Sequence, residues 1–128
     1  MAQAKIGVKK KILIVDDDRD FCDALQARLE KEGYEAQTAM NGEGLPERCI
    51  RMRPGLVILD LNLPKRSGFL ALQDLRSDVS TEAIPVLVLT VRTETAAWER
   101  CYGLAAEGYF VKPFDMDELL KRVRKLVR

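Results

Sequence analysis

Carboxylate residues follow two strongly apolar stretches of this sequence. Three consecutive aspartates, 16–18, come directly after the apolar residues 12–15, and Asp60 comes directly after residues 56–59. Short runs rich in β-branched and aliphatic residues are typical of strands that are buried on both faces of a parallel sheet. Clustered carboxylates repel one another unless a cation offsets their charge. The pattern therefore indicates a hard divalent cation at the end of these strands, and Mg²⁺ fits best because it prefers oxygen ligands.

Two further polar residues, Thr90 and Lys112, end the next two predicted strands. Because parallel strands end on the same side of a sheet, we expect both to lie beside the aspartates, in the crevice where open α/β sheets bind ligands. A lysine and a threonine facing a metal can hold two oxygens of a transferred phosphoryl group, and phosphoryl transfer needs little else. Asp60 is the candidate nucleophile because it stands alone on the central strand, while Asp16 and Asp17 are the candidate metal ligands.

Strand and helix patterns alternate along the chain, with short connections between them. The predicted strands are residues 11–16, 35–39, 56–59, 86–90 and 108–111, and the predicted helices are residues 19–32, 41–52, 69–76, 94–105 and 116–127. Five such units predict a flavodoxin-like, doubly wound α/β fold with strand order 2-1-3-4-5 and helices on both faces of the sheet. We expect residues 1–10 to form a flexible tail and residues 11–128 to form one domain.

Local signals support these helices. In the first helix, Phe21, Leu25 and Leu29 form one apolar stripe and Gly33 is a suitable terminator, while Asp18 is suited to cap its first turn. Asp115 and a glutamate three residues later form a capping-box pattern before the last helix.

Composition excludes several function classes. The chain has no histidine, which rules out Ser-His-Asp and Cys-His catalysis within it, and its three cysteines are too far apart for a zinc motif, so buried, reduced thiols are expected. The 21 basic and 20 acidic residues nearly balance and give no reason to expect direct nucleic-acid binding. No apolar run approaches membrane-spanning length, so we expect a cytoplasmic protein with no membrane contact.

Four segments together carry a family resemblance. They are Val15-Asp16-Asp17, residues 57–64 (VILDLNLP) with Gly68, Leu89-Thr90, and residues 109–114 (YFVKPF). In this order and at this spacing, residues 11–128 resemble the receiver domain of two-component response regulators.

The resemblance implies a role for each residue of the site. Asp60 would accept a phosphoryl group from a phosphohistidine, on a sensor histidine kinase or a histidine phosphotransfer protein, and form a labile acyl phosphate. Asp17 and Asp60 would bind Mg²⁺ directly, Asp16 through a metal-bound water, and Asn62 through its backbone carbonyl. Lys112, with a cis bond to the following proline, would contact the phosphoryl group.

The resemblance also implies a switch. Thr90 would move to hydrogen-bond the phosphoryl group, and Tyr109 would be the switch aromatic on an output surface. For Trp98 on the same surface, partner contact and simple packing are equally open. Such a domain is a signalling phosphoacceptor rather than an enzyme, although it promotes its own phosphorylation and dephosphorylation. Downstream partners would be an effector domain or protein, with a phosphorylation-dependent homodimer as a further candidate, and the chain could be the N-terminal part of a transcriptional regulator.

The sequence departs from the family pattern in three features. Val91 and Arg92 follow the switch threonine, where a small residue is usual, and we hypothesise that they slow hydrolysis or small-molecule phosphorylation by narrowing access. Glu107-Gly108 replaces the acidic pair with which many DNA-binding regulators form dimer salt bridges, which argues against the usual dimer.

Two other classes fit parts of the pattern. A magnesium-dependent phosphohydrolase would use Asp16 as its nucleophile and would need an inserted cap. A flavin-binding module of the same fold would need a Ser/Thr-rich phosphate loop after the first strand, where this chain has aspartates that repel a phosphate.

Overall fold

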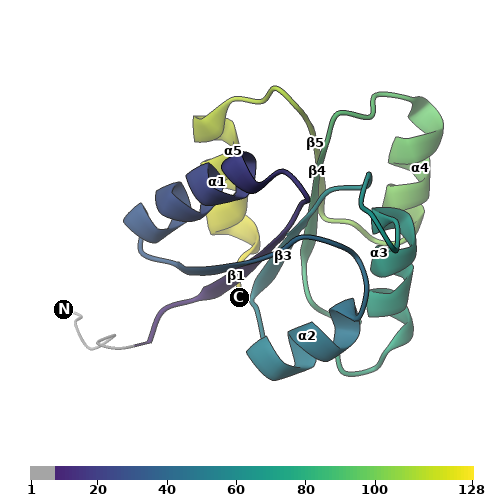
Figure 1. The fold of residues 1–128 in the computed structure, drawn as a ribbon, viewed down its shortest axis with the longest axis horizontal. Coiled ribbons are helices and arrows are strands. Elements are labelled where there is room, and N and C mark those ends of the chain that lie inside the picture. The colour runs from purple at the N-terminus through teal and green to yellow at the C-terminus, as the bar shows by residue number, and fades with distance from the viewer. Residues whose placement is uncertain (1–7) are drawn as a thin grey trace.

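The computed structural model describes residues 8–128 (Figure 1). Five strands alternate with five helices along this part of the chain. They are β1 (Lys11–Val15), α1 (Arg19–Lys31), β2 (Glu35–Ala39), α2 (Leu45–Met52), β3 (Leu56–Leu59), α3 (Gly68–Ser77), β4 (Val86–Thr90), α4 (Thr95–Gly103), β5 (Gly108–Val111) and α5 (Met116–Leu126). Residues 8–10 of the expected tail are exposed and irregular, while residues 1–7 lie outside the described residues.

All strand pairs in the sheet are parallel, and the strand order is β2-β1-β3-β4-β5. The predicted flavodoxin-like fold is therefore confirmed. In the register, Val15 pairs with Leu59, and Leu59 pairs with Val88. The carboxyl ends of the three central strands therefore meet at one edge of the sheet.

Helices cover both faces of the sheet (Figure 1). Alternate side chains of the strands, such as Ile14 and Ile58, pack with α1 and α5, and the others, such as Val15 and Leu59, pack with α2, α3 and α4. Burial differs between the strands. Almost every residue of β1, β3 and β4 is buried, whereas the edge strand β2 has one buried residue. This is the pattern of a sheet whose middle strands are apolar on both sides.

Two helix boundaries differ from the sequence prediction by more than one residue. The second helix begins at Leu45 rather than at Asn41, because Gly44 is left-handed (φ 64°) and the Asn41 side chain accepts a hydrogen bond from the Glu43 amide, which forms a turn. The fourth helix ends at Gly103 rather than at Ala105, because Ala105 itself is left-handed (φ 59°). Both shifts lie outside the strands and leave the site edge unchanged.

The expected caps and thiols are present. The Asp18 side chain accepts from the Phe21 amide, and the Asp115 side chain accepts from the Glu118 amide. All three cysteines are buried and free, as predicted.

No helix among residues 8–128 combines the length and apolar character needed to span a membrane.

Candidate functional site

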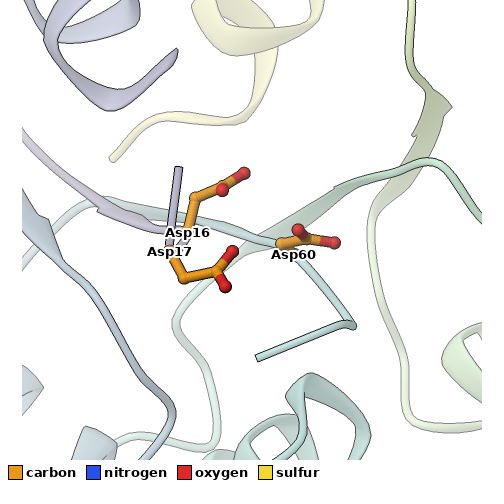
Figure 2. Close-up of side chains that lie close together, drawn as sticks. All are labelled: Asp16, Asp17 and Asp60. Atoms are coloured by element: carbon orange, nitrogen blue, oxygen red, sulfur yellow. The ribbon is translucent and has the colours of Figure 1, made fainter. Parts of the chain in front are cut away.

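The carboxylates of Asp16, Asp17 and Asp60 converge at the carboxyl edge of the sheet. One oxygen from each lies within 4.8 Å of those from the other two, and Figure 2 shows the Asp17 carboxylate turned toward Asp60. The backbone ladder fixes this geometry, because the Asp60 amide donates to the Val15 carbonyl (2.9 Å) and the Asp16 amide to the Ala39 carbonyl (3.0 Å). Asp16 and Asp60 are buried, and Asp17 is exposed.

Backbone amides orient the two buried carboxylates. Asp16 Oδ1 accepts from the Asp18 amide (2.9 Å), and Asp60 Oδ1 accepts from the Asn62 amide (3.3 Å). Behind Asp60 the chain passes close to Gly68, where an added Cβ would lie 2.1 Å from the Asp60 carbonyl oxygen. Only glycine fits this position without moving the backbone of Asp60.

Lys112 enters the cluster from the end of β5. Its Nζ lies 2.6 Å from Asp16 Oδ2 and 3.7 Å from Asp60 Oδ2, and its backbone amide donates to the Thr90 carbonyl (2.8 Å). The Lys112-Pro113 peptide bond is cis. Among the described residues, Lys112 is the cation that pairs with this cluster, so one positive charge faces three carboxylates.

The donor set fits Mg²⁺. Three carboxylates supply oxygen ligands, and one lysine leaves their combined charge negative. A hard divalent cation would remove the remaining repulsion among the three groups.

Thr90 and Tyr109 meet at the same loop, beside the cluster. Thr90 is fully buried, and its Oγ1 accepts from the Arg92 amide at 3.4 Å. The Tyr109 hydroxyl donates to the Arg92 carbonyl at 2.9 Å, and burial raises the pKa of Tyr109 above its ordinary value. Both side chains therefore contact the β4–α4 loop through one residue.

The Arg92 side chain extends from this loop toward the cluster. It forms an ion pair with Glu94, its guanidinium lies 5.2 Å from the Phe69 ring centre, and its Nη1 is 3.5 Å from Asn62 Oδ1. Neighbouring Val91 is 60% exposed. Of the two residues that depart from the family pattern after Thr90, Arg92 thus contacts a residue of the site, Asn62.

Trp98 and Tyr109 line one pocket of about 250 Å³ between α4, β5 and α5. Trp98 is exposed and stacks on Tyr102, which is more exposed still, with ring centres 5.1 Å apart. Glu107 also lines this pocket, but its Oε1 is held by Arg76 (3.2 Å) and by the Val86 amide (2.7 Å). Its carboxylate is thus engaged inside the protein.

The structure brings together the residues that the sequence singled out from four strands. Sequence reasoning missed two contacts of Lys112: its close pairing with Asp16, and the ring of Phe21, whose centre lies 4.2 Å from Nζ. The helical spacing predicts Phe21 on the core stripe with Leu25, but the Phe21 side chain is only half-buried, and the neighbouring Cys22 is buried. The sequence signal for this contact was an aromatic residue, Phe21, one helical turn after the three aspartates.

Comparison of the sequence with curated proteins finds transcriptional regulators. The chain is 41% identical over 118 residues to the DNA-binding dual master transcriptional regulator RpaA of Synechocystis, covering 92% of this chain and 49% of that protein. It is 39% identical over 120 residues to the phosphate regulon transcriptional regulatory protein PhoB of Rhizobium meliloti, covering 92% and 52%. The chain therefore spans about half the length of these relatives.

Solved structures show the same fold. The chemotaxis protein CheY4 of Vibrio cholerae superimposes with a TM-score of 0.85 at 28% identity, covering 94% of this chain and all of that one. The response regulator TrrA of Thermotoga maritima, solved in complex with Mg²⁺ and BeF, has a TM-score of 0.81 at 34% identity and covers 92% and 99%. The family model of the response regulator receiver domain matches residues 12–124. The chain thus belongs to the receiver-domain family of two-component response regulators.

Proposed function

We propose that Asp60 is the phosphoacceptor of this receiver domain. The supporting observation is its position: its carboxylate shares a cluster with Asp16 and Asp17 and lies 3.7 Å from the Lys112 ammonium. An Asp60 oxygen attacks phosphorus, the phosphorus–nitrogen bond of a phosphohistidine breaks, and its electron pair leaves with the imidazole, which takes a proton from solvent. The product is an aspartyl phosphate.

Mg²⁺ is the proposed cofactor, and when bound it offsets the negative charge of the carboxylates and of the transferred group. Asp17 and Asp60 would hold it directly, Asp16 through a water, and Asn62 through its backbone carbonyl. Lys112 would then donate to a phosphoryl oxygen, which it can reach because its ammonium already lies between Asp16 and Asp60. TrrA, whose solved complex contains Mg²⁺ and BeF, supports this assignment.

The switch would act through the β4–α4 loop. Thr90 would exchange its long hydrogen bond with the Arg92 amide for one to the phosphoryl group, and the loop would carry Tyr109 with it through the Arg92 carbonyl. Tyr109 and Trp98 line one pocket, so this movement would reshape the output surface. Phosphorylation would thereby shift a population between two states.

A sensor histidine kinase or a histidine phosphotransfer protein would supply the phosphoryl group. Because the curated relatives are transcriptional regulators of twice this length, we place residues 11–128 as the receiver part of a larger regulator with an effector domain or protein downstream. A phosphorylation-dependent homodimer stays a candidate. Glu107 would contribute little to its ion pairs, because Arg76 already holds that carboxylate.

Val91 and Arg92 would slow hydrolysis of the aspartyl phosphate by limiting access to it. The position of the Arg92 guanidinium between Asn62 and Phe69 supports this effect. Phosphate release should be faster in Val91→Ala than in wild type, and equal rates would reject the idea.

Intact-mass analysis tests the proposed acceptor. The protein is incubated with acetyl phosphate and Mg²⁺, and wild type is compared with Asp60→Asn, Asp16→Asn and the exposed control Asp23→Asn. We expect wild type and Asp23→Asn to gain one hydroxylamine-labile phosphate and Asp60→Asn to gain none. Undiminished labelling of Asp60→Asn would refute the assignment. Loss of labelling confined to Asp16→Asn, with continuous turnover in wild type, would favour a phosphohydrolase, and a yellow purified protein would favour a flavin module.

A further inference from the structure

An aromatic pair lies at Lys112, and one of its rings faces the ammonium. Phe21 comes from the first turn of α1, and Phe114 comes two residues after Lys112. The Lys112 ammonium lies 4.2 Å from the centre of the Phe21 ring, and the two rings meet edge to face at 6.1 Å and 86°. The site described above uses neither ring.

Lys112 needs a contact that does not compete for the metal. Its close partner, Asp16, and its second partner, Asp60, are both proposed to serve Mg²⁺. A lysine side chain is long and flexible, and without a partner it would leave its position. The face of an aromatic ring attracts an ammonium through its quadrupole and offers no ligand atom to a metal. The Phe21 ring can therefore hold the ammonium while the carboxylates are engaged elsewhere.

The fold fixes the Phe21 ring before any ligand binds. Asp18 caps α1 and accepts from the Phe21 amide at 3.1 Å, which sets where the first turn begins. The next residue, Cys22, is buried and donates to the Asp16 carbonyl, so the helix start is tied to the end of β1. Phe114 then packs its ring edge-to-face against Phe21. The ring is thus anchored from α1 and from the loop that carries Lys112.

We propose that Phe21 is a positioning residue, whose ring face holds the Lys112 ammonium at the phosphoacceptor site. This proposal rests on the function assigned to Lys112 above. When a phosphoryl group arrives, the ammonium moves from Asp16 toward a phosphoryl oxygen and keeps its contact with the ring. Phe21 touches neither phosphorus nor metal and acts only through the lysine.

Nuclear magnetic resonance of the metal-free protein tests the contact itself. Protons that lie over a ring face are shifted upfield, so the Lys112 Hε protons should resonate upfield of those of exposed Lys121. Phe21→Leu should abolish the shift and Phe21→Tyr should keep it. The control is Phe110→Leu, which removes a half-buried ring of the same core that faces Arg122 (6.0 Å) instead of Lys112. A Lys112 shift that is absent in wild type or unchanged in Phe21→Leu overturns the proposal.

The phosphorylation rate tests the consequence. With acetyl phosphate and Mg²⁺, Phe21→Leu should react about fivefold more slowly than wild type, the change expected for losing one partly exposed cation–π contact. Phe21→Tyr and Phe110→Leu should react like wild type. Equal rates in Phe21→Leu and wild type, or equal losses in Phe21→Leu and Phe21→Tyr, overturn the proposal. Phosphate labelling that persists in Asp60→Asn would instead refute the proposed function. The resonance shift would still show the contact between Lys112 and the Phe21 ring.

Discussion

Replacing Lys112 by methionine should destabilise the metal-free protein and make it depend on Mg²⁺. The substitution keeps an unbranched apolar side chain, one atom shorter than that of lysine, and removes its charge. Asp16 and Asp60, whose side chains are only 3% and 9% exposed, would then face each other without a cation. Removing one partner of a buried ion pair leaves a charge without compensation, which costs more than the pair contributed.

The distances set the size of this loss. At an effective dielectric constant of about 20, the attraction of Lys112 is about 6 kcal/mol to Asp16 at 2.6 Å and about 4 kcal/mol to Asp60 at 3.7 Å. Desolvation of the ammonium offsets most of this attraction, and Lys112 is still 18% exposed. We therefore expect a loss near the lower end of the range for broken buried pairs, about 3 kcal/mol. For 128 residues, with an unfolding entropy of about 0.27 kcal/mol/K, this lowers Tm by about 11 °C.

Thermal unfolding in EDTA and in Mg²⁺ measures both effects. The control is Lys121→Met, because Lys121 is 66% exposed in its pair with Glu118 and should cost less than about 0.5 kcal/mol. Mg²⁺ should raise the Tm of Lys112→Met more than that of wild type, since the cation takes over the neutralisation of the carboxylates. Equal Tm losses in the two variants, or an Mg²⁺ response no larger than that of wild type, would refute the electrostatic account of this cluster.

Three further predictions follow from backbone strain and from buried thiols. Gly68→Ala should lower the free energy of unfolding in urea by about 3 kcal/mol, because its Cβ would overlap the Asp60 carbonyl. The control Gly103→Ala has open space around its Cβ and should lower it by nothing, and equal losses in the two variants would contradict this. Ala105→Gly should raise the free energy of unfolding by about 0.5–1 kcal/mol, because glycine adopts the left-handed backbone of this position without strain. A lower free energy of unfolding in the same assay would contradict this strain. Burial raises the pKa of Cys49 from 9.0 to about 11, so the stability that this thiol contributes is complete below pH 9 and is lost as the pH rises to 11. Between pH 8 and 11, the free energy of unfolding of wild type should therefore fall by about 2 kcal/mol more than that of Cys49→Ala. A constant difference between the two free energies over this range would contradict this.

The strands and the site edge were predictable because their signals are local and strong. Uniformly apolar runs marked β1, β3 and β4, and each ended in a residue of the site, so parallel topology alone gathered Asp60 and Thr90 at one edge. The cap at Asp18 followed from residue type and position. These features depend on few distant contacts.

The parts that sequence missed depend on tertiary contacts. In the loop before α2, the backbone of Gly42 packs against the Arg66 carbonyl oxygen, which a Cβ at Gly42 would approach to 2.1 Å, and nothing in the local sequence shows this contact. The pairing of Lys112 with Asp16 joins residues 96 positions apart, and the choice between Asp16 and Asp60 is settled by side-chain geometry alone. The helical spacing of Phe21 predicts packing in the core, yet its ring faces the ammonium of Lys112, which periodicity does not predict.

Chemical mapping of the phosphorylated residue tests the central claim most directly. Borohydride reduces an aspartyl phosphate to homoserine, so the protein is incubated with acetyl phosphate and Mg²⁺, reduced, digested and sequenced by mass spectrometry. Our account predicts homoserine at position 60 and unmodified aspartate at positions 16 and 17. Homoserine at position 16 or 17, with none at position 60, would contradict it.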